Sequence, residues 1–115
     1  MALEHIETIT KFLDKATVWI LVLTFGYNAT TKDYELTDPT SIVIDTIYNP
    51  DNEAEETNKT MTQYASQTGV YEYLFHKGTA TASLESGHWR GEGRVIDGVG
   101  ADAIITTFSF SFDVN

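Results

Sequence analysis

The stretch that decides the fold is GHWRGEGRVIDGVGADAIITTFSFSFDV, which runs from Gly87 to Val114. Apolar and polar residues alternate from Ala103 to Val114, the pattern of a strand with one buried face. The segment from His88 to Ile96 alternates in the same way. The Asp97-Gly98 pair between them is a strong signal for a tight hairpin turn. We therefore predict that the chain ends in a two-stranded antiparallel hairpin.

Two glycines lie on the inner face of the first strand of this hairpin. Gly91 and Gly93 alternate with charged residues, and glycine weakens a strand because it has no side chain to pack. We expect them to make room for a neighbouring ring, that of Trp19, Phe108 or Phe110. A larger residue at Gly93 would then overpack the core.

Earlier segments show the same strand character. Thr17 to Tyr27 is apolar on both faces, which indicates a central strand covered on two sides, or one whose second face is buried by a partner. Thr40 to Tyr48 is predicted as a strand with a β-bulge at Asp45-Thr46, which keeps its isoleucines on one face. Val70 to His76 follows the tight turn Gln67-Thr68-Gly69. Turn signals recur about every 10 residues, which is typical of an antiparallel sandwich or small barrel.

The other segments are shorter. Residues 1–16 alternate weakly and are interpreted as an N-terminal segment or edge strand, with a short helix as the alternative. Ile9 is out of step with Ile6 in that alternation. Residues 17–115 form the sandwich itself. Within it we expect a polar loop at Asn28–Pro39, an acidic loop or edge strand at Glu53–Asn58, a strand at Lys59–Tyr64 with Met61 inward, and a small-residue loop at Lys77–Ser86.

Length and charge limit the number of domains and the classes of partner that the chain can bind. A chain of 115 residues makes one domain. Seven Lys and Arg against 17 Asp and Glu give a net charge of −10, which disfavours nucleic acid and anionic membranes as partners. Eight acidic residues and no Lys or Arg lie between Asp33 and Glu56. They make a solvated face, a cation site or a docking surface for a basic partner.

Nothing in the sequence predicts export. The first residues, Met1 to Glu7, lack a basic segment followed by an apolar one, so no signal peptide is predicted. The apolar run from Val18 to Leu23 is too short to span a bilayer. Cysteine is absent, so no disulfide staples the fold. We expect synthesis and retention in the cytoplasm, unless the chain leaves by assembly into a particle.

Three phrases carry a resemblance to a known class of domain. They are Tyr48-Asn49-Pro50-Asp51-Asn52, Thr68-Gly69-Val70-Tyr71-Glu72-Tyr73 and Gly87-His88-Trp89-Arg90. With the alternating final strand, they resemble the immunoglobulin-like modules of microbial and viral surface proteins, which are similar in fold to fibronectin type III and macroglobulin-type domains. The glycine usual after Pro-Asp is replaced here by Asn52.

The resemblance implies an all-β, immunoglobulin-like antiparallel β-sandwich of about seven strands. It brings no catalytic residue and no cofactor. Modules of this kind that stand alone without an export signal resemble phage accessory proteins, such as capsid decoration, head or tail components. The expected function is therefore a non-enzymatic structural protein of a virion. Its expected partners are other copies of itself, as a homo-oligomer, or a capsid or tail protein, and it would be made in the host cytoplasm.

Candidate sites are few. Asp51, Glu53, Glu55 and Glu56 carry the oxygen ligands that calcium prefers, without the order of a known calcium loop. His76 and His88, with Glu72 or Glu85, could bind zinc, although histidines near turns are more often surface residues. The residues expected to contact a protein partner are Ile6, Ile9, Phe12, Tyr27 and Tyr34.

Two other functions stay open at this point. Trp19, Tyr71, Tyr73 and Trp89 could form an aromatic platform for a carbohydrate or receptor, although core packing explains them better. A small β-barrel with a hollow interior would instead hold a lipid or act as an enzyme. Exposed rings in a groove would favour the first alternative, and an apolar cavity with a carboxylate would favour the second.

Overall fold

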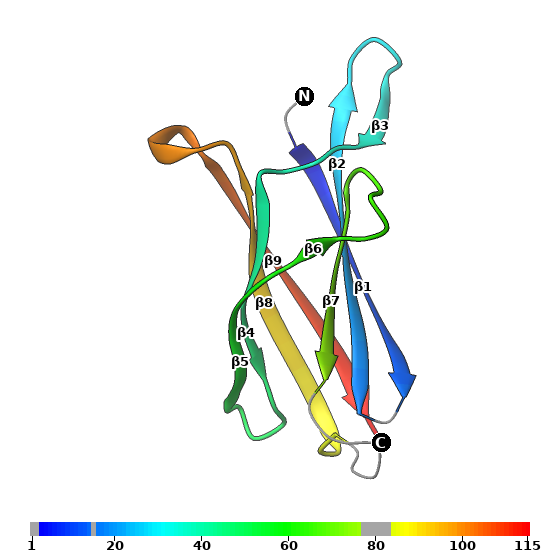
Figure 1. Ribbon diagram of the computed structural model, residues 1–115, viewed down its shortest axis with the longest axis vertical. Coiled ribbons are helices and arrows are strands. Elements are labelled where there is room, and N and C mark those ends of the chain that lie inside the picture. The colour runs from blue at the N-terminus through cyan, green and yellow to red at the C-terminus, as the bar shows by residue number, and fades with distance from the viewer. Residues whose placement is uncertain (1–2, 15, 77–83) are drawn as a thin grey trace.

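The computed structural model describes residues 3–14, 16–76 and 84–115, which form two antiparallel sheets packed as a sandwich (Figure 1). One sheet has the order β1-β2-β7-β6, with β3 also pairing with β2, and the other has the order β5-β4-β8-β9. This confirms the predicted all-β antiparallel sandwich. The strands are β1 (Leu3–Asp14), β2 (Thr17–Asn28), β3 (Asp33–Leu36), β4 (Ser41–Tyr48), β5 (Ala54–Thr60), β6 (Thr62–Gln63), β7 (Val70–His76), β8 (Gly87–Asp97) and β9 (Ile104–Val114). No helix among the described residues is long and apolar enough to cross a membrane.

The C-terminal hairpin is present as predicted. β8 and β9 pair in unbroken register from Gly87 opposite Val114 to Asp97 opposite Ile104. Gly98 has a φ of 104°, a conformation that glycine adopts readily, and a short 3-10 turn at Gly100–Asp102 completes the connection. The Asp97-Gly98 signal therefore marks the turn correctly.

The two inner glycines of β8 make room for phenylalanine rings of β9. A Cβ atom at Gly91 would overlap the ring of Phe110, and one at Gly93 would lie 2.5 Å from both Phe108 Cζ and the backbone oxygen of Val43. This confirms the predicted role of the glycines and selects Phe108 and Phe110 as the rings. Trp19, the third ring considered, lies half-buried on the outer face of the other sheet.

An aromatic cluster holds one end of the core together. Trp89 is 1% exposed, stacks on Phe112 with ring centroids 5.8 Å apart, and contacts Phe75 at 5.6 Å. The indole nitrogen of Trp89 donates a hydrogen bond of 2.8 Å to the carbonyl of Glu85. The indole ring of Trp89 is therefore packed against other rings, and its one polar atom has a hydrogen-bond partner.

The predicted β-bulge in β4 is present, because the register with β8 shifts between Ile44 and Thr46. As a result Ile42, Ile44 and Ile47 are all fully buried. Asp45 faces outward and accepts a hydrogen bond of 2.9 Å from Arg94 Nε.

One segment differs from the sequence predictions. The strand predicted at Lys59–Tyr64 is divided: β5 ends at Thr60 in one sheet and β6 begins at Thr62 in the other. Met61 is buried where the chain crosses from one sheet to the other. Its amide donates a hydrogen bond of 2.8 Å to the carbonyl of Ile42, so Met61 points inward as predicted, between the two strands. Two other segments agree with the predictions at least in part. The short strand β3 lies within the polar loop predicted at Asn28–Pro39, and Glu53–Asn58 lies largely within β5, as the edge-strand alternative has it.

The N-terminal segment is an edge strand and not a helix. β1 pairs with β2 along most of its length, so it belongs to the sandwich. It also lies beside β9 of the other sheet (Figure 1), where the Thr8 and Thr10 hydroxyls donate hydrogen bonds of 3.3 Å to the carbonyls of Ser109 and Ser111. The predicted loop at Lys77–Ser86 falls mainly outside the described residues.

Candidate interaction surface

Two hairpins project from the same end of the sandwich, the upper end in Figure 1. One joins β2 to β3, and the other joins β8 to β9. We call this region the hairpin end, and define it by its six exposed large apolar residues. They are Tyr27, Tyr34, Leu36, Val99, Ile104 and Ile105.

The β2–β3 hairpin is held by one asparagine at its turn. Asn28 Oδ1 accepts hydrogen bonds from the amides of Thr30 and Thr31, at 2.9 and 3.3 Å, and its Nδ2 donates to Glu35 at 3.0 Å. Tyr27 and Tyr34 are opposite each other across the strands, with their rings edge to face at 5.4 Å. The turn is thus ordered, and it presents a preformed pair of tyrosines.

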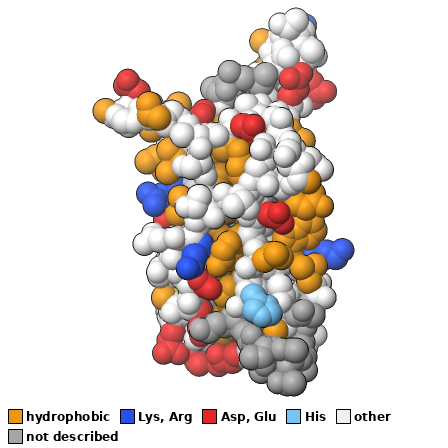
Figure 2. Space-filling view, in the orientation of Figure 1, with side chains coloured by type: hydrophobic (Ala, Val, Ile, Leu, Met, Phe, Trp, Pro, Cys, Tyr) orange, Lys and Arg blue, Asp and Glu red, His pale blue; other side chains and the backbone are white. Residues whose placement is uncertain are grey.

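The β8–β9 hairpin is tied at its base to the loop before β4. The Gly98 amide donates to the Thr40 hydroxyl at 2.8 Å, and the Thr40 amide donates to the Ile96 carbonyl at 2.9 Å. Beyond these bonds the tip carries Val99, Ile104 and Ile105 into solvent. In Figure 2, the left-hand projection, which is the β8–β9 hairpin, carries hydrophobic side chains beside acidic ones.

The hairpin end exposes more apolar surface than an isolated domain needs. Its six residues are between 39% and 78% exposed. Three of them lie on each hairpin, and exposed apolar side chains that gather on one part of a soluble protein are typical of interaction sites. Tyrosine is also among the residues that contribute most to protein interfaces.

The residues predicted to contact a partner fall into four places. Tyr27 and Tyr34 come together at the hairpin end, close to His5 of β1, whose ring centroid lies 6.2 Å from that of Tyr34. Ile6 faces inward and packs against the core. Ile9 faces outward and is 47% exposed, whereas Phe12 lies at the seam with β9, edge to face with Phe112 at 5.8 Å.

The four acidic residues proposed for calcium do not form one cluster. Asn49 Nδ2 donates to Glu53 and Glu55, at 3.4 and 3.0 Å, while its Oδ1 caps the amides of Asp51 and Glu53. Glu56 instead pairs with Lys59 at 3.4 Å. No group of three or more metal-binding side chains within residues 3–14, 16–76 and 84–115 has a geometry that could hold a metal ion. The turn at Asn49 is explained by its own hydrogen bonds.

Glu85 adds a further carboxyl beside Asp51, Glu53 and Glu55. A hydrogen bond to Asp51 raises the pKa of Glu85, and desolvation and the charges of Asp51, Glu53 and Glu55 raise it further. A carboxyl with a raised pKa in the folded state stabilises the fold at low pH. That contribution is lost as the pH rises through the raised pKa.

We therefore expect Glu85→Gln, which mimics the protonated acid at every pH, to be more stable than the wild type at pH 7. The gain should shrink towards pH 4, because the wild-type carboxyl takes up its own proton as the pH falls through its raised pKa. Thermal melts of both proteins at the two pH values test this. An equal difference in melting temperature at pH 4 and pH 7 would contradict it.

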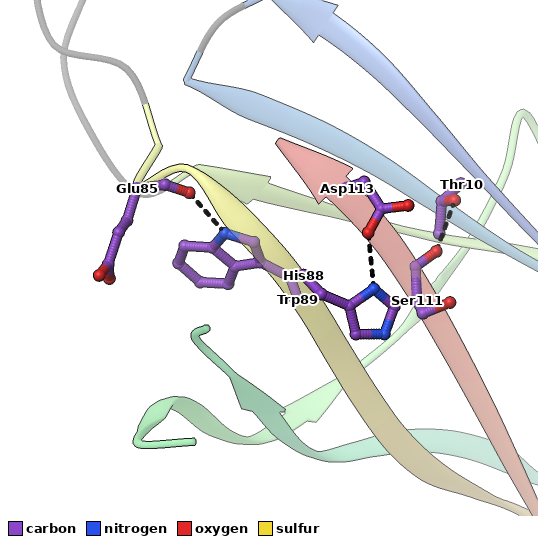
Figure 3. Close-up of polar contacts among 6 residues, drawn as sticks. All are labelled: Thr10, Glu85, His88, Trp89, Ser111 and Asp113. Atoms are coloured by element: carbon purple, nitrogen blue, oxygen red, sulfur yellow. Dashed lines mark hydrogen bonds and ion pairs between the residues drawn. The ribbon is translucent and has the colours of Figure 1, made fainter. Parts of the chain in front are cut away.

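The two histidines considered for zinc have other partners. His88 Nδ1 bonds to Asp113 at 2.6 Å across the C-terminal hairpin, and His76 Nδ1 bonds to the Thr17 hydroxyl at 2.6 Å. Figure 3 shows the His88–Asp113 pair beside the Trp89–Glu85 bond and the Thr10–Ser111 bond. The His88–Asp113 bond therefore joins the start of β8 to the end of β9.

The aromatic residues considered for sugar binding do not form a common platform. Trp89 is buried, and Tyr71 and Tyr73 face the core from β7. Burial raises the pKa of Tyr71, and the charge of Asp38 and a hydrogen bond to it raise that pKa further. Burial also raises the pKa of Tyr73, and Glu56 adds to that increase in the same two ways. Trp19 lies on the opposite face of that sheet, against Tyr64 at 5.3 Å, and donates to Glu72.

The cavities found on the surface are open grooves. One, of about 500 Å³, lies along the β1–β9 seam and is lined mainly by hydroxyl and charged side chains. Its neighbour, of about 380 Å³, continues towards the start of β1. Both lie outside the core.

The sequence predicts two of the six residues of the hairpin end, Tyr27 and Tyr34. Val99, Ile104 and Ile105 were assigned to a turn and a half-buried strand. The available signal was the adjacent pair Ile104-Ile105, since neighbouring residues of a strand point to opposite faces and one isoleucine must face outward. Leu36 lies between Glu35 and Thr37, so no such pair marks it.

Comparison with known proteins adds no family to this description. No family model, no curated protein and no solved structure matches the chain. The function is inferred from the geometry of the surface.

Proposed function

We propose that this protein is a structural interaction module that binds a protein partner through its hairpin end. The observation that carries the proposal is the grouping of six exposed apolar residues on two ordered hairpins at one end of the sandwich. Because hydrogen bonds already hold both hairpins, little conformational entropy is lost when a partner covers them.

Charge indicates what kind of partner fits. Asp33 and Glu35 flank the tyrosine pair, and Asp97 and Asp102 flank the apolar tip of the other hairpin. With a net charge of −10, the protein is expected to attract a basic surface. The partner we propose is a protein with apolar pockets bordered by Lys or Arg.

The resemblance to immunoglobulin-like modules of viral surface proteins supports a more specific form of the proposal. The sandwich would be an immunoglobulin-like domain, and the partner a capsid or tail protein of a virion. A repeated partner surface would then bind many copies of the module by symmetry.

Removing apolar groups from the two hairpins should weaken binding and leave the fold intact. We expect Tyr34→Ser and Ile104→Ser each to reduce the affinity for the native partner complex by about tenfold or more, the usual effect of truncating a residue at the centre of an interface. Co-sedimentation of the tagged variants with that complex, isolated from its source, measures the effect.

Leu74→Ser is the matched control, because Leu74 is 51% exposed on β7, outside the two hairpins. It should bind as the wild type does. Loss of binding by the control, with full binding by the two hairpin variants, would overturn the proposal.

A further inference from the structure

The residue types in the middle of β1 follow a pattern that is symmetric about Ile9. The segment is Ile6-Glu7-Thr8-Ile9-Thr10-Lys11-Phe12. Ile9 has a threonine on each side. Beyond the threonines lie the oppositely charged Glu7 and Lys11, and the large apolar residues Ile6 and Phe12 stand at the two ends. A strand with this symmetry is complementary to a second copy of itself running in the opposite direction.

The fold leaves this strand in a position to pair. β1 is the edge of its sheet, and β2 is its only ladder partner among the described strands. Its register with β2 is unbroken from His5 to Phe12, and the irregularities lie outside that stretch. Proline and bulges, two of the devices that usually prevent edges from pairing, are absent from the regular stretch.

The hydrogen bonds described between β1 and β9 run through side chains of β1, and no ladder between the two strands is described. Thr8 and Thr10 reach β9 through their side-chain hydroxyls, on the inner face of the sheet. In an antiparallel ladder, alternate residues direct their backbone N–H and C=O groups towards each neighbour. The groups of β1 that point away from β2 therefore have no described strand to bind.

We propose that β1 pairs with β1 of a second copy across a two-fold axis at Ile9, so that two sandwiches share one continuous sheet. Glu7 then lies opposite Lys11 of the second copy, and Lys11 opposite its Glu7. Thr8 lies opposite Thr10, and Ile6 opposite Phe12. Opposite charges, paired threonines and paired apolar residues are the cross-strand pairs that stabilise sheets.

The pairing also accounts for two exposed apolar residues of β1. Ile9 is 47% exposed and Phe12 is 42% exposed. Ile9 would meet its own counterpart at the axis, and Phe12 would meet Ile6. The strand edge is a different surface from the two hairpins, so this inference does not rest on the proposed function.

Charge exchange at two positions tests the pairing. Glu7→Lys and Lys11→Glu each replace both attractive pairs at the axis by repulsive ones, and each should raise the dimer dissociation constant about tenfold or more. The double variant Glu7→Lys/Lys11→Glu restores opposite charges and should dimerise like the wild type. Analytical ultracentrifugation measures the three constants, and melting temperatures show that each variant is folded.

Mixing the two single variants is the sharper measurement. A strand with lysine at both positions complements one with glutamate at both, so native mass spectrometry should show a heterodimer in excess of either homodimer. Asp102→Lys, which changes the net charge by the same amount as Glu7→Lys at the β8–β9 connection, should dimerise like the wild type.

Three results would overturn the pairing. They are a wild-type protein that stays monomeric at millimolar concentration, a dimer whose constant is unchanged in both single variants, and a statistical mixture of dimers when the variants are combined. The last two would place the contact between copies elsewhere on the molecule.

Discussion

Trp89→Ala should lower the free energy of unfolding by about 3–5 kcal/mol, the usual cost of removing a fully buried large aromatic side chain. The indole is 1% exposed and contacts both Phe75 and Phe112. Single domains are stable by only about 5–15 kcal/mol, so the loss is a large fraction of the total. Urea denaturation followed by circular dichroism gives the two free energies.

Trp89→Phe is the control for this substitution. It keeps an aromatic ring beside Phe112 but loses volume and the hydrogen bond to the Glu85 carbonyl. We expect it to cost about 1–3 kcal/mol, as expected for a smaller cavity and an unsatisfied carbonyl. Equal stability of the wild type and Trp89→Ala would show that the aromatic cluster is not the centre of the core.

Gly93→Val should lower the free energy of unfolding by about 3 kcal/mol, the upper end of the usual cost of overpacking. A Cβ atom at this position meets the Phe108 ring and the backbone oxygen of Val43, both at 2.5 Å. A ring can rotate away, but the Val43 carbonyl belongs to the strand paired with β8 and is fixed by the sheet. The same urea titration measures the loss.

A pair of double variants separates the two obstacles. At Gly91 the nearest atoms all belong to the Phe110 ring. Phe110→Leu should therefore recover part of the stability lost in Gly91→Ala. Phe108→Leu should recover less of the loss in Gly93→Ala, because the Val43 oxygen remains. Equal recovery in both pairs would mean that the backbone oxygen is not the limiting contact.

Local patterns predicted those parts of the fold that depend on neighbouring residues. Asp97-Gly98 specifies its own turn, and the slip in alternation along Thr40–Tyr48 requires a bulge if the isoleucines are to share a core. The glycines of β8 were predicted for a similar reason, since an apolar face without side chains must receive atoms from elsewhere.

Other features depend on which sheet a segment joins, and alternation alone does not specify this. The crossing from β5 to β6 at Met61 looks like one strand in the sequence. For the same reason Trp19 was considered as a ring beside the glycines of β8, although it lies on the outer face of the other sheet. Both faces of β2 are apolar, and only the position of the second sheet shows that Val18, Ile20 and Val22 are the buried set.

The interaction surface was predicted in part. Tyr27 and Tyr34 were predicted as partner contacts, and they are two of the three exposed apolar residues on the β2–β3 half of the hairpin end. Ile6 was selected from its position in the sequence, but it packs against the core. The other half of the surface lies some 70 residues later in the chain. Only the topology brings it to the same end of the sandwich.

Hydroxyl-radical footprinting of the native complex tests the hairpin end most directly. The free protein and the protein within its complex are oxidised in parallel, and the modified residues are identified by mass spectrometry. The account predicts protection of Tyr27, Tyr34, Ile104 and Ile105 in the complex. Full oxidation of these four residues in the complex, with protection confined to the outer face of the β5-β4-β8-β9 sheet, would contradict it.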